Sequence, residues 1–223
     1  MLNKETISIS LKLFIITAVA ALCLAFVNKI TSPVIAENQV KTMEASQKEV
    51  MPEATIFEEV NLLNSDVNKE GSTCLIESLY KAKKDSEDIG YVVNAVSKSG
   101  YGGDIRVMVG IRADLTVNKV KITESSETAG LGLKASEPEF IDQYIGRAGS
   151  LNVIKNSPPT TEGSDIAAIS GATVTSRAVT DAVNAALALV ESESARADET
   201  GPDAETIKNV ISEETIKQLE EDN

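Results

Sequence analysis

The chain has 223 residues, 42% of them hydrophobic, which is enough for one well-packed domain with additional segments. It contains no His, which excludes a Ser-His-Asp triad and a His-ligated metal or haem. The formal net charge of −13 argues against nucleic-acid binding, because phosphate backbones are bound by Lys and Arg. The two cysteines, Cys23 and Cys74, form no metal-binding or redox pair motif.

The first predicted element is a membrane anchor. Residues Ser8 to Val27 make a 20-residue run, long enough for a helix to cross ~30 Å of hydrocarbon. A cleaved signal peptide is one alternative, but no A-x-A site follows the run directly. A buried core helix is another, although Leu13–Val27 shows no polar face. Lys4 and Lys12 before the run, against Lys29 after it, favour a cytoplasmic N-terminus.

A break is expected after the anchor. Thr31-Ser32-Pro33 predicts the end of the spanning helix, because proline removes a backbone donor. Residues 34–50 predict a juxtamembrane helix that Pro52 ends, and residues 55–67 predict a connection.

The middle of the chain predicts an antiparallel sheet with one side facing the core. Apolar and alternating runs separated by short turns indicate four strands, over residues 73–82, 89–96, 105–111 and 116–124. Glycine-rich loops are expected at residues 97–103 and 125–133.

Helices are expected to flank this sheet. Ser136 is expected to cap a short helix over residues 137–144, and another strand is expected within 151–163. Apolar residues at helical spacing predict a long helix over 175–190. The segment from Glu191 onward contains eleven acidic and three basic residues, which gives it a net charge of −8 (3 − 11). For residues 204–221 both a weak helix and a solvated tail remain open.

The segment Ser170-Gly171-Ala172-Thr173, just before the long helix, is the strongest candidate for a site. Helix N-termini have unpaired N–H groups and partial positive charge, which suit a phosphate. The small residues let a ligand approach the backbone, and Ser170, Thr173 and Thr175 supply hydroxyls. A well-capped helix start without a ligand is the alternative reading.

Four motifs together resemble a known family. They are G-Y-G-G-D-I-R-V-M-V-G-I at 100–111, E-T-A-G-L-G at 127–132, F-I-D-Q-Y at 140–144 and S-G-A-T at 170–173. With the N-terminal anchor, they resemble the FMN-binding G subunits of Rnf electron-transport complexes, which are ion-translocating ferredoxin:NAD oxidoreductases. The C subunit of the sodium-translocating NADH:quinone reductase is a relative. The resemblance covers nearly the whole chain except the acidic tail.

The resemblance implies covalent FMN, attached through a phosphoester to Thr173 by a separate flavin transferase. It implies that the loop from Glu127 to Gly132 packs against the flavin. The expected cofactor-binding residues are Thr173, Ser170, Gly171, Ala172, Thr175, Glu127, Thr128, Gly130 and Leu131. No catalytic side chain and no metal are expected, because the cofactor carries the redox chemistry.

Two positions depart from the family pattern. Ala167 stands three residues before Ser170, where the family usually has Asp, and the nearest acid is Asp165. Three explanations remain open. Asp165 takes the place of the expected Asp through a shifted loop, the transferase tolerates the absence of that Asp, or the attachment of FMN is inefficient. Ala129 replaces a more usual Pro, which should loosen the turn slightly.

These observations predict an α+β protein, with an N-terminal transmembrane helix and then an FMN-binding domain that has an antiparallel sheet and flanking helices. The expected divisions are 1–30 (cytoplasmic N-terminus and anchor), 31–70 (juxtamembrane helical connection), 71–191 (FMN-binding domain) and 192–223 (acidic tail).

The predicted function is electron transfer within the membrane-bound complex. The expected location is the inner (cytoplasmic) membrane, crossed once, with most of the chain on the non-cytoplasmic side. The expected partners are the other membrane and peripheral subunits, the transferase and the membrane, with no nucleic acid. One alternative is an anchored, non-redox ligand- or partner-binding module that has lost its flavin; a stand-alone flavin reductase is another.

Overall fold

The computed structural model describes residues 4–60, 72–85, 87–155, 157–158 and 163–199. They fall into two compact units, which divide between Ala45 and Ser46. The expectation for residues 204–221 lies outside the described part of the chain.

The first unit is a single helix, α1 (Lys4–Val50), which continues to the first residues of the second unit. The predicted break at Thr31-Ser32-Pro33 is wrong, because Pro33 lies inside the helix. A proline removes one intrahelical hydrogen bond, whereas a full break would free several backbone groups at two new helix ends. Phe14 and Leu24 are 68% and 72% exposed, which does not fit a buried core helix. Among the described residues, α1 is the one helix long and apolar enough to cross a membrane.

The second unit contains a five-stranded antiparallel sheet in the order β1-β2-β3-β4-β5. Its strands are β1 (Ile56–Val60), β2 (Cys74–Lys84), β3 (Glu87–Ser97), β4 (Ile105–Arg112) and β5 (Val117–Ser125). The four predicted strands are confirmed. The structure adds β1, which lies within the predicted connection and pairs with β2.

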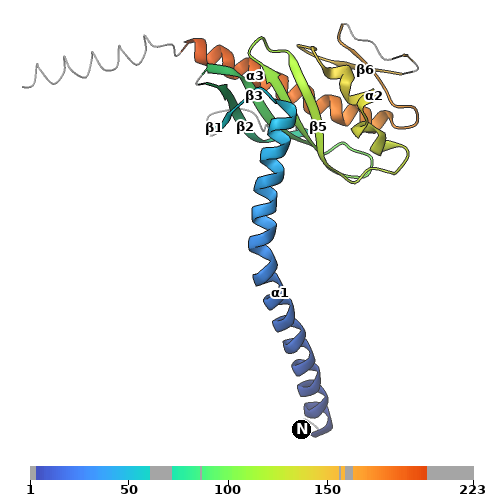
Figure 1. The fold of residues 1–223 in the computed structure, drawn as a ribbon. Helices are drawn as coiled ribbons and strands as arrows, with labels where there is room; N and C mark the ends of the chain where they lie inside the picture. The colour runs from blue at the N-terminus through green and yellow to red at the C-terminus, as the bar shows by residue number, and fades with distance from the viewer. Residues whose placement is uncertain (1–3, 61–71, 86, 156, 159–162, 200–223) are drawn as a thin grey trace, which may run out of the picture. The chain divides into compact units, whose positions relative to one another are not determined.

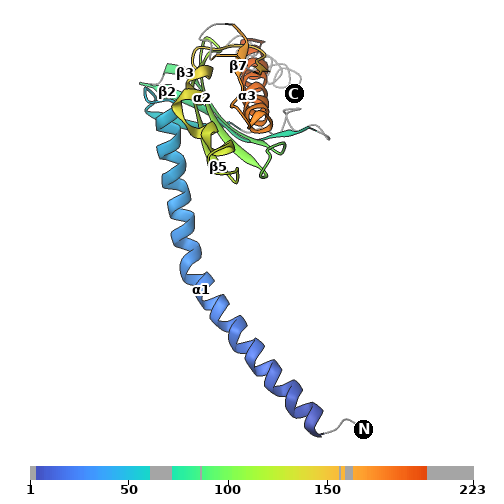
Figure 2. The ribbon, with the colours of Figure 1, turned by 90° about the vertical axis from the view of Figure 1, so that its right-hand side faces the viewer.

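The main core lies between this sheet and α3 (Thr173–Glu199), which crosses one face against β2, β3 and β4 (Figures 1 and 2). Successive strand residues point to opposite faces, so alternate positions such as Val107, Val109 and Ile111 meet the helix. The apolar stripe predicted on the long helix is confirmed, since Ala178, Val179, Ala182 and Val183 are fully buried.

The second face of the sheet is also covered, so the prediction of one core-facing side is wrong. Val92 and Met108, which do not belong to the α3 core, are 0% and 2% exposed. The chain leaving α1 covers this face: the side-chain amide of Asn118 donates to the carbonyl of Val50 at 2.7 Å. A Cβ at Gly110 would lie 2.4 Å from that same carbonyl, so only glycine allows the close approach.

Short elements link β5 to α3. They are η1 (Gly132–Ser136), α2 (Pro138–Ile141), η2 (Asp142–Tyr144) and a parallel pair, β6 (Asn152–Ile154) and β7 (Asp165–Ala167). Ser136 does not cap the short helix, so that prediction is wrong. Pro138 takes the first helical position and holds the residue before it, Glu137, in an extended conformation, which makes Glu137 the N-cap.

Candidate functional site

The S-G-A-T segment forms the entrance of α3, as its residue types predict. The helix begins at Thr173, two residues earlier than expected from the apolar stripe. Gly171 has φ +78°, a left-handed conformation that favours glycine, and a Cβ there would lie 3.2 Å from Leu131. The Ser176 hydroxyl donates to the Ala172 carbonyl at 2.9 Å and accepts the Ile169 N–H at 3.0 Å, which fixes the turn into the helix.

A cavity of about 520 Å³ opens at this entrance. We call it the α3 cavity; its lining residues are Tyr101, Glu127, Thr128, Leu131, Gly132, Gly171, Ala172, Thr173, Val174 and Thr175. The volume is within the range of small-molecule and cofactor sites. Tyr101, Leu131 and Val174 are 75%, 46% and 49% exposed, so apolar surface is open to a ligand at this cavity. The cavity therefore combines a helix N-terminus with apolar packing surface.

Glu127 is a buried carboxylate that joins two loops at the α3 cavity to α3 itself. Its Oε1 accepts the Gly102 N–H at 3.1 Å, and its Oε2 accepts the Thr175 hydroxyl at 3.0 Å. A Cβ at Gly132 would lie 2.4 Å from Oε2, and a Cβ at Gly100 2.9 Å from Oε1. The two glycines make room for the carboxylate, and the carboxylate connects their loops to α3. We call these two hydrogen bonds the Glu127 clasp.

The hydroxyls near the helix entrance differ in their availability. Thr175 is 1% exposed and its hydroxyl is engaged by Glu127. Thr173 is half-buried and lines the cavity, and within the described residues no hydrogen bond to its side chain is present. Ser170 is exposed but lines a different, smaller cavity. Thr173 is therefore the hydroxyl best placed for a group held in the α3 cavity.

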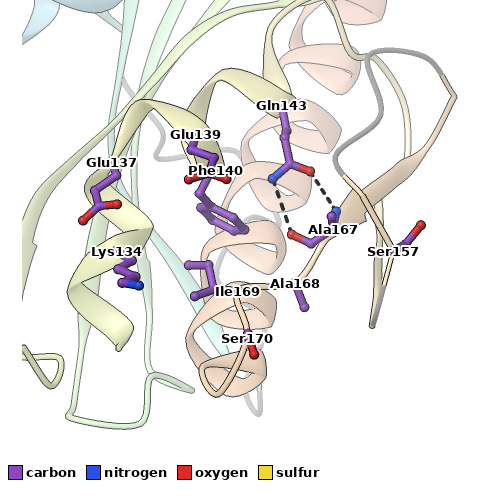
Figure 3. Close-up of a pocket in the computed structure, with 10 residues that line it drawn as sticks. All are labelled: Lys134, Glu137, Glu139, Phe140, Gln143, Ser157, Ala167, Ala168, Ile169 and Ser170. Carbon is purple, nitrogen blue, oxygen red and sulfur yellow. Dashed lines mark hydrogen bonds between the residues drawn. The ribbon is translucent and has the colours of Figure 1, made fainter. Parts of the chain in front are cut away.

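The smaller cavity, of about 260 Å³, lies between α2 and the chain that leads into the S-G-A-T segment (Figure 3). Ala167 forms part of its wall, and both backbone polar groups of Ala167 bind the Gln143 side chain. We call it the Gln143 cavity. Ala167, at the position where the resemblance predicts Asp, thus presents only a methyl group, and Asp165 does not line this cavity.

The structure brings most of the predicted site residues together. Seven of the nine line the α3 cavity: Glu127, Thr128, Leu131, Gly171, Ala172, Thr173 and Thr175. Ser170 lines the Gln143 cavity, and Gly130, with φ +76°, shapes the loop without lining either. Tyr101, Gly132 and Val174 are lining residues absent from the predicted set; the first two lie in motifs that pointed to this site. Among the described residues, no group of three His, Cys, Asp or Glu lies close enough to hold a metal ion.

Comparison with known proteins decides the family. The FMN-binding domain family model matches residues 100–188, which include both the cavity loops and the start of α3. The chain is 38% identical to the G subunit of the Na⁺-translocating ferredoxin:NAD⁺ oxidoreductase complex of Acetobacterium woodii, over 81% of this chain and 89% of that protein. The chain belongs to the family of Rnf G subunits.

Other members of this Rnf family are similarly long. The G subunit of the proton-translocating ferredoxin:NAD⁺ oxidoreductase complex of Clostridium ljungdahlii is 35% identical, over 83% of this chain and 91% of that protein. The G subunit of the ion-translocating oxidoreductase complex of Methanosarcina acetivorans is 31% identical, over 86% of this chain and 97% of that protein. Among solved structures, Shewanella oneidensis NqrC matches with a TM-score of 0.44 and 22% identity, over 60% of this chain and 66% of that chain.

Proposed function

We propose that this protein relays electrons within a membrane-bound, ion-translocating ferredoxin:NAD oxidoreductase complex, through FMN carried covalently on Thr173. The observation that supports the proposal most directly is the position of Thr173. Its side chain lines a cofactor-sized cavity at the first turn of α3, and the neighbouring Thr175 hydroxyl is engaged elsewhere.

The residues around the α3 cavity suit FMN. The first amides of a helix have no intrahelical acceptor, so the start of α3 offers donors and partial positive charge to a phosphodiester. Tyr101, Leu131 and Val174 provide exposed apolar surface for a planar ring system. When bound, FMN supplies the electron transfer, while the protein contributes position and environment.

The proposed bond joins the Thr173 oxygen to the FMN phosphorus, and the hydroxyl proton is lost. A flavin dinucleotide such as FAD, used by the flavin transferase, would supply the FMN half and release AMP, so that the atoms balance. Covalent attachment removes dissociation as a route of cofactor loss.

The proposal also includes the remaining subunits of the complex and the membrane itself. α1 exposes a long apolar surface, which is suited to a single crossing of the inner membrane. The Lys residues before the span favour a cytoplasmic N-terminus, which would put the FMN-binding domain on the non-cytoplasmic side.

Co-production of the full chain with a flavin transferase tests attachment. After denaturing electrophoresis, the wild-type band should fluoresce as a flavin, and Thr173→Ala should abolish the signal. Ser170→Ala is the matched control, because it removes a nearby hydroxyl that does not line the α3 cavity. Loss of fluorescence in Ser170→Ala alone would contradict the assignment, and a colourless wild type would favour a module that has lost its flavin.

A further inference from the structure

The strand that leads to the attachment segment has two edges that are bound differently. On one edge β7 pairs with β6: the Asn152 N–H donates to the Ser164 carbonyl and the Ala168 N–H to the Ile154 carbonyl, both at 2.8 Å. The residues that bond toward β6, Ser164 and Ala168, lie directly before and after β7 and are even-numbered. The odd-numbered residues therefore direct their backbone groups to the opposite edge.

Side chains bind this opposite edge at every second residue. The Arg147 guanidinium donates to the carbonyls of Gly163 and, at 3.5 Å, of Asp165. Gln143 binds both polar groups of Ala167: its Oε1 accepts the N–H at 2.8 Å and its Nε2 donates to the carbonyl at 3.4 Å (Figure 3).

The series continues into the attachment segment. The Ile169 N–H donates to the Ser176 hydroxyl of α3 at 3.0 Å. Carbonyls or amides at 163, 165, 167 and 169 are thus all bound, with the period of two that a neighbouring strand would have.

The side chains that bind this edge are themselves fixed. Gln143 and Arg147 are 7% and 3% exposed, and the Arg147 Nε donates to the Gln143 carbonyl at 2.9 Å. Tyr144, beside them, is fully buried, and its hydroxyl lies 2.7 Å from that of Thr180 in α3. This segment is therefore held to the same helix that Thr173 begins.

We propose that Gln143 is a positioning residue: its side chain forms the two hydrogen bonds to Ala167 that a residue of a neighbouring strand would form. In this way it sets the register in which residues 165–170 reach Thr173. A one-residue slip of a strand exchanges the faces of all its side chains. It would also shift Ser170 and Gly171 relative to the start of α3. The role in flavin attachment rests on the function proposed above, but the register itself does not.

Hydrogen exchange of the full-length protein tests the register. In Gln143→Leu, which keeps the volume and loses both hydrogen bonds, amides of residues 163–169 should exchange about 10-fold faster. Amides of α3 from 178 to 190 should remain unchanged. Glu139→Gln is the matched control, because Glu139 lines the same cavity and no hydrogen bond of its side chain is present among the described residues. Exchange in Gln143→Leu within twofold of wild type would overturn the proposal.

Gln143→Glu gives a second, internal test that does not depend on how well Gln143→Leu folds. A protonated carboxyl reproduces the amide pattern, accepting the Ala167 N–H and donating to its carbonyl, whereas a carboxylate faces that carbonyl without a proton. Protection of 163–169, normalised to wild type at each pH, should therefore be restored as the pH falls.

The wild-type comparison removes the contribution of the other charged groups around Gln143. These are Lys134, Glu137, Glu139, Arg147 and Asp165. A pH-independent defect in Gln143→Glu would contradict the hydrogen-bonding role.

Flavin loading separates the two proposals. In limiting transferase, Gln143→Leu should carry about 10-fold less FMN per chain than wild type, and Gln143→Glu should recover loading at lower pH relative to wild type. If wild type carries no flavin while exchange responds as described, the proposed function fails and the register role stands. If wild type is fully loaded and exchange does not respond, the register role fails alone.

Discussion

Removal of the Glu127 carboxylate should loosen the α3 cavity. Glu127→Ala deletes both bonds of the Glu127 clasp, to the Gly102 N–H and to the Thr175 hydroxyl. Hydrogen bonds to a charged group each contribute about 1.5–3 kcal/mol, and a buried donor left without a partner adds a penalty. Gly102 is exposed and can turn to water, whereas Thr175 is buried, so the lower part of the summed range applies.

We therefore expect Glu127→Ala to lower the free energy of unfolding by about 3 kcal/mol. For a chain of this size that corresponds to a fall in Tm of roughly 6–12 °C, measured by thermal denaturation of the full chain in detergent. Glu127→Gln is the matched variant. Its carbonyl can accept from Gly102 and its amide can donate to the Thr175 hydroxyl, so the loss should be only about 1 kcal/mol.

Two results would refute this account of Glu127. A Glu127→Ala protein within about 0.5 kcal/mol of wild type, the range of ordinary surface substitutions, would show that the clasp contributes nothing to stability. A Glu127→Gln protein as unstable as Glu127→Ala would show that the negative charge, and not the hydrogen-bond geometry, is what matters.

Three further outcomes are expected at the α3 cavity and in the core beside it. A Cβ at Gly132 would lie 2.4 Å from the Glu127 Oε2 and 2.8 Å from its Cβ, and only the first of these contacts is removed by Glu127→Ala. In denaturant titrations the destabilisation by Gly132→Ala should therefore be smaller, but not zero, in the Glu127→Ala background. Burial raises the pKa of Tyr144 above its ordinary value, so its stabilising contribution is complete below about pH 10 and is lost as the pH rises. The stability difference between wild type and Tyr144→Phe, about 1 kcal/mol at pH 8 from the bond to Thr180, should therefore shrink by pH 11 in urea titrations; a constant difference would contradict this. Tyr101→Ala should change unfolding by less than about 0.5 kcal/mol, because Tyr101 is exposed, yet weaken non-covalent FMN binding in fluorescence titrations of unmodified protein.

Local patterns in the sequence predicted the elements that depend on local chemistry. Alternating apolar residues identified the four strands from 73 to 124, and helical spacing identified the buried face of α3. β1 was missed because its five residues, I-F-E-E-V, are mostly exposed and show no alternation of buried positions. The prediction of a break at Pro33 was wrong because the loss of one hydrogen bond does not end a helix of this length.

The contacts that shape the site could not be predicted in the same way. Glu127 forms hydrogen bonds with residues 25 positions before it and 48 positions after it. A short motif around Glu127 therefore could not predict that its carboxylate joins these segments. Gln143 binds a backbone 24 residues away, and its motif gave no indication of that partner. By contrast, the small residues and hydroxyls of S-G-A-T marked the helix entrance correctly, because helix starts and phosphate sites have local signatures.

Mapping FMN to a single residue tests the central claim most directly. The full chain, co-produced with a flavin transferase, would be digested and its flavin-bearing peptide fragmented in a mass spectrometer. We predict the added mass of one FMN on Thr173 and on no other residue. FMN on Ser170 or Thr175, or an unmodified Thr173 in a chain exposed to active transferase, would contradict the proposed site.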